Sequence, residues 1–434
     1  MIRWVSKLFS SKFIKNTGWM MFAQIYQLLV SLVIGVISAR YLGPSNYGTI
    51  NYAASYISFF TIACALGLEG IVVKEMIDDR NKEGVILGSS IAMRFVAGLL
   101  SLVSVCAIVL FLNPGDRLLL IVTFLQSLVL LFNAFHIIDT WYQSLLRSKT
   151  SSIIKCIAYT GMSIYRVWLL VTGKNVVWFA FATSLDALLI AILFLVKYHQ
   201  DGKIKLSISL SMSKRLIGLS YHLIISSLMA VIYNQMDRIM IGKMIDQTHV
   251  GYYAAASTIC HMWLFVPQAI SNSARPLIME LKDKNNKLYL QRIKQIIGIT
   301  FWLGIFFASI ISILSHFIIN TLYGADYIEA KGPLLFMIWS TVFASLSYVR
   351  AIWMISEGKQ KFTKQILICG VAVNLILNSI GIPVFGMNGA AAATFITELT
   401  CCLIAPLIIK ETRVFVTYII TSLNPLKILD NRKG

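Results

Sequence analysis

The stretch YNQMDRIMIGKMIDQTHVGYYAAAS, residues 233 to 257, places a neighbouring acid and base, Asp237 and Arg238, in sequence that otherwise has the composition of a membrane helix. After a turn, the stretch continues as a run of small residues. The passage ARYLGPSNYGTINYAASYI, residues 39 to 57, has the same layout, with a basic residue eight positions before a glycine in both stretches. The pattern indicates two related halves, of which the second carries the charged pair.

The composition of the chain predicts an integral membrane protein. Its 434 residues are 57% hydrophobic and 13% charged, against about 45–50% and 25% in soluble domains. The apolar runs are long enough to cross a bilayer and lack two-residue alternation, so they predict helices and not barrel strands. We predict twelve spans: 18 to 38, 47 to 73, 85 to 112, 118 to 143, 153 to 172, 175 to 196, 216 to 242, 251 to 273, 296 to 322, 333 to 356, 364 to 384 and 387 to 409.

The net charge of +19 is explained by topology. Of the 38 Lys and Arg, 29 lie in the N-terminus, every second connection and the C-terminus, five lie in the opposite connections, and four lie inside spans. The positive-inside rule then predicts that both termini are cytoplasmic. A nucleic-acid partner is therefore not expected.

A second internal match extends the two-half pattern. Trp141 and Ser144 end the fourth predicted span, and Trp353 and Ser356 end the tenth, so that one constant offset in the numbering relates both pairs. At the same offset Asp186 in the sixth span falls opposite Glu398 in the twelfth. Two parallel repeats of six helices are typical of transporters whose site lies between the halves.

These matches predict an all-α protein of two pseudo-symmetric six-helix lobes. The first lobe spans residues 1 to 196 and the second residues 216 to 409. A basic cytoplasmic linker, 197 to 215, joins them, and a cytoplasmic tail occupies 410 to 434. Within that tail, VFVTYIITSL from Val414 is too short to cross a bilayer and predicts an interfacial helix.

The sequence contains none of the motifs that would indicate bond-breaking chemistry. It has no GxxxxGK[ST], HExxH, GxSxG or GxGxxG motif, and its six histidines are scattered. Its seven cysteines lie in apolar segments without a CxxC pattern. We therefore expect no catalytic residues, no metal, no cofactor and no enzymatic activity.

Ionisable residues at membrane depth are the candidates for function, because they are costly there and usually face a cavity or a partner. Four arginines at several depths could form a path for an anionic group, although snorkelling or structural ion pairs would also explain them. Three acids and an amide could couple or gate transport; local packing of their helices is the alternative. The arginines are Arg94, Arg166, Arg238 and Arg350, and the second set is Asp186, Asp237, Glu398 and Asn234.

Four stretches carry a family resemblance: ARYLGPSNYG from Ala39, QMDRIMIGKM from Gln235 with the following VGYYAAAS, SEGKQKF from Ser356, and GMNGAAAATFITE from Gly386. Together they resemble the polysaccharide transporter family, the O-antigen flippases of the drug-exporter-like superfamily. The resemblance covers essentially the whole chain. It implies two six-helix lobes around a central cavity, in which cations hold the pyrophosphate and sugars of the substrate.

The resemblance also implies a location and a substrate. Such proteins are embedded in the lipid of the bacterial inner membrane, across which they move oligosaccharides linked to undecaprenyl pyrophosphate. They can act beside other polysaccharide assembly proteins. Alternating access would enclose the headgroup while the polyprenyl tail stays in lipid. The alternatives are an ion-coupled small-molecule antiporter of the same fold, a membrane polysaccharide polymerase or ligase, and a structural partner in a glycan assembly complex.

Overall fold

The computed structural model describes residues 12–202 and 205–423, and regular structure in this part of the chain is helical. The helices form two units, one ending at Val231 and one beginning at Ile232. The boundary falls within one helix, α10 (Leu210–Met244), which begins in the first unit and ends in the second. The linker at 197 to 215 and the predicted lobe boundaries stay predictions.

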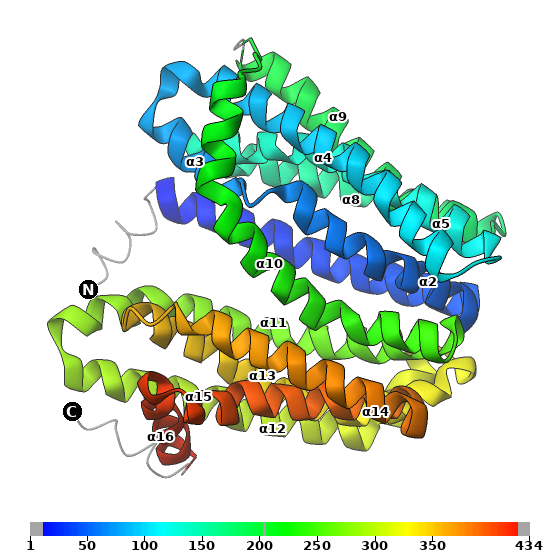
Figure 1. Ribbon diagram of the computed structural model, residues 1–434, viewed down its shortest axis with the longest axis vertical. Helices are drawn as coiled ribbons and strands as arrows, with labels where there is room; N and C mark the ends of the chain where they lie inside the picture. Colours follow the sequence, from blue (N-terminus) through cyan, green and yellow to red (C-terminus); the bar gives the residue numbers. More distant parts are fainter. Residues whose placement is uncertain (1–11, 203–204, 424–434) are drawn as a thin grey trace. The chain divides into compact units, whose positions relative to one another are not determined.

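The first unit opens with a helix that bends at a glycine. Helix α2 (Lys12–Ala65) contains Gly43 with φ 72°, a value that other residues rarely adopt, and Pro44 follows without an amide hydrogen to donate. The bend lies between two predicted spans, 18 to 38 and 47 to 73. The other elements before α10 are α3 (Glu69–Asp78), η1 (Arg80–Lys82), α4 (Glu83–Leu112), α5 (Arg117–Ser127), α6 (Val129–Phe132), η2 (Asn133–Ile137), α7 (Ile138–Ser144), α8 (Ser148–Val171) and α9 (Val176–Gly202) (Figure 1).

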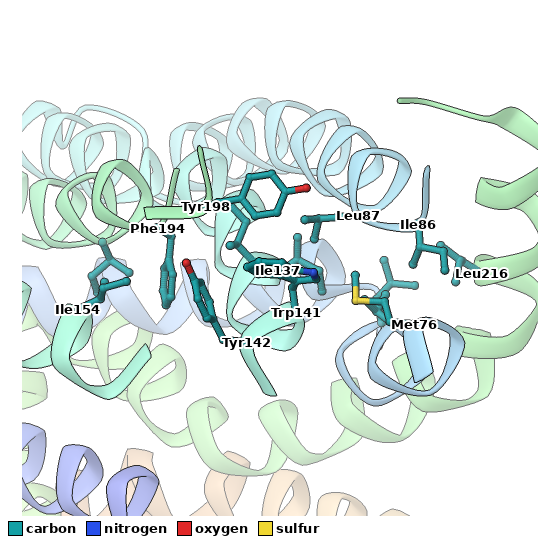
Figure 2. Close-up of a cluster of buried hydrophobic side chains, with 14 of the residues drawn as sticks. Met76, Ile86, Leu87, Ile137, Trp141, Tyr142, Ile154, Phe194, Tyr198 and Leu216 are labelled. Atoms are coloured by element: carbon teal, nitrogen blue, oxygen red, sulfur yellow. The ribbon is translucent and has the colours of Figure 1, made fainter. Parts of the chain in front are cut away.

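Aromatic side chains fill the core of the first unit (Figure 2). Trp141 and Tyr142 of α7 meet edge to face with ring centroids 5.0 Å apart, and Trp141 meets Tyr198 of α9 at the same distance. Such edge-to-face pairs stabilise beyond the area that they bury. Leu216, fully buried, adds the start of α10 to the same cluster. The cluster therefore holds α7, α9 and the start of α10 together.

The second unit continues from α10 through long helices. Asp246 begins α11, because its side chain accepts a hydrogen bond from the backbone amide of His249 at 2.9 Å. The elements that follow α10 are α11 (Gln247–Lys284), α12 (Asn286–Leu322), η3 (Ala325–Ala330), α13 (Lys331–Ser356), α14 (Phe362–Leu399), the π-helical turn η4 (Thr400–Ile404), α15 (Ala405–Ile408), η5 (Lys410–Thr412) and α16 (Arg413–Ser422). Helix α13 packs against α11, α12 and α14.

Helix α14 folds back on itself at Gly386, where φ is 58°. Its two arms then touch at glycines, because a Cβ built on Gly389 would overlap the carbonyl oxygen of Gly381. The arms correspond to the predicted spans 364 to 384 and 387 to 409. Glycine at both positions thus allows close backbone contact between the arms.

The predicted helix at Val414 is present as α16. Its buried side chains, Phe415 and Ile419, join Trp353 of α13 in the core of the second unit, with the Trp353 and Phe415 rings 5.3 Å apart. Ile420 on its other side is exposed. Its placement at a membrane surface stays a prediction.

The repeated Trp and Ser pairs have the same geometry at both helix ends. The Ser144 hydroxyl donates to the carbonyl of Trp141 at 2.8 Å, and the Ser356 hydroxyl donates to the carbonyl of Trp353 at 2.9 Å. Helices α7 and α13 end in these two turns. The sequence match therefore reflects a shared local structure.

Eight helical segments in the described residues are long and apolar enough to cross a membrane, and the bent helix α10 would make nine. Two of them, Gly18–Asp78 and Phe362–Ile408, contain the bends at Gly43 and Gly386. The other six are Arg80–Leu112, Arg117–Ser144, Ser148–Val171, Val176–Asp201, Asn286–Leu322 and Ala325–Ser356. The count of twelve and the cytoplasmic termini stay predictions.

Candidate functional site

The Asp237 carboxylate is the centre of a polar cluster in the second unit. It lies on α10 and is 5% exposed. Two hydroxyls donate to its Oδ2, those of Tyr253 and Thr394, each at 2.5 Å. Two side-chain amides donate to its Oδ1, from Asn374 at 3.1 Å and from Asn378 at 2.6 Å. Four donors thus surround one buried acid.

The hairpin of α14 supplies three of these four donors. Asn374 and Asn378 lie one turn apart on its first arm, so they share a helix face, and the Asn378 amide also donates to the Asn374 carbonyl oxygen at 3.0 Å. Thr394 lies on the second arm. The close contact between Gly381 and Gly389 brings both arms within reach of α10.

The four donors satisfy the hydrogen-bonding capacity of a buried acid, as buried polar groups require. The side chains of Asp237, Asn374, Asn378 and Thr394 also offer oxygen atoms, which hard cations prefer. The Asn378 Oδ1 atom is buried without a hydrogen-bond partner. The cluster could therefore hold a small cation through one acid and several neutral oxygen atoms. Elsewhere in the described residues, no three His, Cys, Asp or Glu side chains come together in a group suited to a metal.

A second contact links the same helices one turn away. Tyr233 lies one turn before Asp237 on α10, and Glu398 lies one turn after Thr394 on α14. The Tyr233 hydroxyl donates to Oε1 of Glu398 at 2.6 Å. In one contact the acid comes from α10, and in the other it comes from α14. The two acids Asp237 and Glu398 therefore belong to one polar stripe.

Arg350 of α13 lies near this stripe. Its side chain is 8% exposed and its Nη1 donates to the carbonyl oxygen of Cys401, in the π-helical turn that follows α14. π-Helical turns often occur at functional positions. Sequence reasoning placed Arg350 and Glu398 in different roles, and the structure attaches Arg350 to the turn that begins two residues after Glu398.

Arg238 and Asn234 are not among the four donors to the Asp237 carboxylate. Arg238 is half-buried, and its Nη2 donates to the Ser257 hydroxyl at 3.1 Å. Asn234 is exposed, and none of the four donors to Asp237 comes from it. The neighbouring charges Asp237 and Arg238 thus have different partners, as expected from their divergence of about 100° around the helix.

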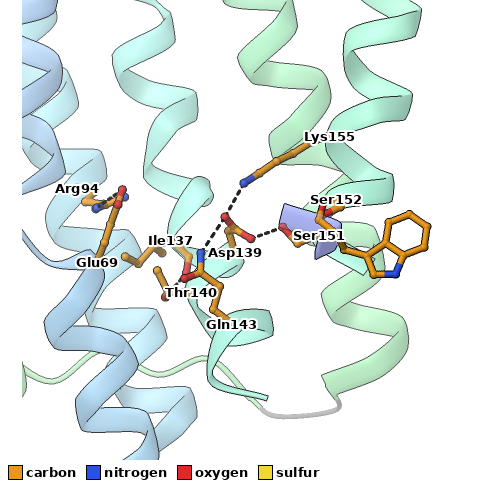
Figure 3. Close-up of polar contacts among 10 residues, drawn as sticks. Glu69, Arg94, Ile137, Asp139, Thr140, Gln143, Ser151, Ser152 and Lys155 are labelled. Carbon is orange, nitrogen blue, oxygen red and sulfur yellow. Dashed lines mark hydrogen bonds and ion pairs between the residues drawn. The ribbon is translucent and has the colours of Figure 1, made fainter. Parts of the chain in front are cut away.

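In the first unit, Arg94 is bound at a break between two helices (Figure 3). It is 3% exposed, and its Nη2 donates to the carbonyl oxygen of Ala65 at 3.0 Å and lies 3.5 Å from Oε1 of Glu69. The break between α2 and α3 contains two successive residues with positive φ, Leu66 at 53° and Gly67 at 59°. Arg94 therefore stabilises this turn, whatever else it contacts.

Arg166 lies on α8 and Asp186 lies on α9. The ion pairs of the described residues do not include one between them. The Oδ1 atom of Asp186 is buried without a hydrogen-bond partner. Within the residues it describes, the structure gives no contact that joins Arg94, Arg166 and Asp186 in one site.

Asp139 forms a further cluster at the start of α8, also seen in Figure 3. Lys155 donates to it at 2.6 Å and Gln143 at 3.2 Å, and the Ser151 hydroxyl is also bound to it. The acid thus has partners on its own helix α7 and on α8. This geometry gives Asp139 a structural role between the two helices.

Sequence reasoning missed the donors to Asp237. The four donors, Tyr253, Asn374, Asn378 and Thr394, are not among the residues predicted from the sequence. One signal was available, since two asparagines one turn apart in the apolar run NLILN are unusual inside a membrane helix. Their partner on α10 could not be identified from sequence alone.

Comparison with known proteins identifies the family. Residues 13–282 match the family model described as "Polysaccharide biosynthesis protein". The chain belongs to that family. A second model, MatE, matches residues 223–380, which include Asp237 and both asparagines of its cluster.

Named relatives of this polysaccharide biosynthesis protein cover most of its length. It is 24% identical over 374 residues to a probable low-salt glycan biosynthesis flippase, Agl15, of Haloferax volcanii, covering 82% of this chain and 75% of that one. It is 23% identical to a probable flippase, AglR, of the same organism, covering 86% and 79%. It is 19% identical to the capsular polysaccharide biosynthesis protein CapF of Staphylococcus aureus, covering 89% and 96%.

Solved structures share the fold of this family member. The inward closed lipid II flippase MurJ superposes with a TM-score of 0.72 at 14% identity, covering 97% of this chain and 93% of that one. An inward-facing multidrug resistance transporter of the MATE family superposes with a TM-score of 0.69 at 12% identity, covering 94% and 96%. The chain is therefore an all-helical, multi-pass membrane protein with a transporter fold.

Proposed function

We propose that this protein is a flippase for lipid-linked glycans. The observation that carries the proposal is its relationship, over 82% and 86% of the chain, to a probable glycan biosynthesis flippase and a probable flippase, within a polysaccharide biosynthesis family. The headgroup of a lipid-linked glycan needs a protein to carry it across the membrane, because sugar and pyrophosphate would lose their hydration in the hydrocarbon. Alternating access between two states would carry the headgroup across while the lipid tail stays in the bilayer.

The specific substrate that we propose is an O-antigen unit linked to undecaprenyl pyrophosphate, and the membrane is the bacterial inner membrane. Four arginines would neutralise the pyrophosphate during its passage: Arg94, Arg166, Arg238 and Arg350. Arginine suits this role because its planar guanidinium binds phosphate oxygens in pairs. Arg94 and Arg350 are already bound to backbone carbonyls, so phosphate would have to compete with or add to those bonds.

We propose that an ion gradient drives the cycle, since the sequence carries no P-loop. The Asp237 cluster is the preferred coupling site, because its carboxylate is buried and four oxygen-bearing side chains donate to it. Asp186 and Glu398 are the other candidate acids. A cation that moves through the membrane to such a site would draw on the membrane potential. Each elementary charge that crosses the whole potential supplies about 2.3 kcal/mol of free energy per 100 mV.

The test is a flipping assay with purified protein in liposomes. A fluorescent oligosaccharide linked to polyprenyl pyrophosphate is incorporated into both leaflets, and a membrane-impermeant reductant bleaches the outer leaflet. An active flippase makes nearly all of the fluorescence accessible, whereas empty liposomes protect about half. If the protein leaves the protected fraction unchanged under every ion gradient tried, the proposal fails.

A second candidate is a small-molecule antiporter of the same fold. It is favoured by the MatE match, which covers Asp237 and three of its four donors, Tyr253, Asn374 and Asn378. The same liposomes loaded with a cationic dye distinguish the two functions. Ion-driven dye efflux without glycan flipping would establish the antiporter.

A further inference from the structure

The segment between α9 and α10 is attached to the first two turns of α4. The backbone amide of Ser207 donates to the carbonyl oxygen of Gly84 at 3.2 Å, and the amide of Ser209 donates to the Ser89 hydroxyl at 2.9 Å. We name residues 205 to 210 the strap. Its backbone is thus fixed against one membrane helix of the first unit.

Two further features fix the strap in place. A Cβ on Gly88 would overlap the carbonyl oxygen of Ser207, so only glycine lets the strap approach α4 this closely. Beyond it, Arg215 at the start of α10 forms a salt bridge with Glu75 of α3, at 3.1 Å. The strap is therefore held to α4 at Ser207 and Ser209, and Arg215 holds the start of the helix that follows it.

That exposed side is apolar. Leu206 is 42% exposed, Ile208 72% and Leu210 79%. Three large aliphatic side chains so close in sequence would be unfavourable in water, at about 25 cal/mol for each Å² of exposed apolar surface. Some apolar partner must therefore cover this side of the strap.

The depth of the strap points to the membrane surface. It contacts α4 between Gly84 and Ser89, and α4 begins at Glu83 and is one of the membrane-spanning helices. At about 1.5 Å per residue these contacts lie within about 9 Å of the helix start. Interfacial segments bury their apolar side chains by about 5–10 Å, so the two depths agree.

Charge identifies the class of lipid. Residues 197 to 215 contain five Lys or Arg and one acid, Asp201. Lys205 and Lys214 flank the apolar side chains and are exposed. Basic residues beside a membrane attract anionic headgroups by about 1 kcal/mol each. A protein partner fits less well, because so short a segment offers far less area than the roughly 1600 Å² that a standard protein interface buries.

We propose that the strap binds anionic phospholipid at the membrane surface, with Leu206, Ile208 and Leu210 at the acyl boundary and Lys205 and Lys214 at the headgroups. This site is separate from the Asp237 cluster and does not depend on the transported substrate. It anchors the beginning of α10 to the bilayer as well as to α3 and α4.

The experiment places the photoreactive residue p-benzoylphenylalanine at Ile208 in the full-length protein. Nanodiscs contain phosphatidylcholine and phosphatidylglycerol in a ratio of about 7:3, and intact mass spectrometry detects the crosslinked species. The matched control carries the probe at Asn81, an exposed polar residue of η1. We expect a phospholipid adduct at position 208 in several-fold excess over position 81, enriched in phosphatidylglycerol above its share of the disc.

A companion variant, Lys205→Gln with Lys214→Gln, tests the charge. It should keep the adduct at position 208 but reduce phosphatidylglycerol to its share of the disc. Absence of lipid adducts at position 208, or a peptide adduct in their place, would overturn the lipid site. Equal enrichment with and without the two lysines would overturn the assignment to anionic headgroups.

Discussion

Leu146 and Gly358 occupy matching positions in the two repeats and share the same left-handed backbone conformation, with φ of 53° and 66°. In each case the following amide bonds back by five residues, Arg147 to the carbonyl of Tyr142 at 2.9 Å and Lys359 to that of Met354 at 2.7 Å. Both turns thus end a helix in the manner that normally recruits glycine. The first half uses leucine in a position where the second uses glycine.

Leu146→Gly should stabilise the protein. A left-handed conformation costs a residue with a side chain about 1–2 kcal/mol, and Leu146 is 50% exposed, so little packing is lost. We expect a gain of about 1 kcal/mol and a higher unfolding temperature in detergent, followed by tryptophan fluorescence. Gly358→Ala is the reverse control and should lower the unfolding temperature. A lower unfolding temperature in both variants would contradict the argument that Leu146 is strained.

Gly389→Ala should destabilise the second unit, because its new methyl group would meet the carbonyl of Gly381. Overpacking of this kind costs about 1–3 kcal/mol. Gly35→Ala is the matched control, since a Cβ there has open space around it. A thermal melt of both variants checks the prediction, and equal melting temperatures would show that the α14 hairpin tolerates separation of its arms.

Asp237→Asn should abolish the dependence of transport on an ion gradient. The substitution keeps the size of the side chain and replaces a carboxylate that accepts four hydrogen bonds by a neutral amide. We expect at least a tenfold slower gradient-driven rate in liposomes, with normal amounts in the membrane. Asp246→Asn, at the exposed start of α11, should match the wild type because asparagine caps helices as well as aspartate. Wild-type ion dependence in Asp237→Asn would exclude this acid as the coupling site.

Arg94→Ala and Arg350→Ala should each lower surface polysaccharide at least tenfold in a host that depends on this protein. Loss of one charge-assisted contact to phosphate removes about 1.5–3 kcal/mol. Export and membrane abundance are measured together, because both arginines also bind backbone carbonyls. Lys197→Ala, at an exposed pair with Asp201, is the control. If both arginine variants export at wild-type levels with equal expression, the proposed cation path is wrong.

Glu357 should make stability depend on acid pH. Burial raises the pKa of this carboxyl, but hydrogen bonds from Lys282 at 2.5 Å and Tyr289 at 2.9 Å outweigh burial and lower the pKa below the usual 4.5. A lowered pKa stabilises the folded state above pH 4.5, and this contribution is lost as pH falls through the folded value. The advantage of the wild type over Glu357→Gln in thermal melts should therefore shrink between about pH 6 and pH 3. A constant difference would contradict the pKa argument.

Sequence predicted the helical membrane architecture because apolar length and charge placement are local properties. The bends at Gly43 and Gly386 also fell between predicted spans, since glycine beside proline or small residues interrupts an apolar run. The Asp237 cluster was only half predicted. Its acid is visible as a charge in an apolar helix, but the donors come from α11 and both arms of α14, and sequence periodicity carries no information about which distant faces meet.

Asp237 has a consequence for how the protein is made. Tyr253 follows it by 16 positions, but Asn374, Asn378 and Thr394 follow by 137, 141 and 157. During synthesis the acid therefore reaches the membrane long before three of its four donors exist, and an acid without partners is costly there. The ribosome delivers the acid of the cluster early and most of its stabilising partners late, so premature termination before α14 leaves Asp237 without three of its donors.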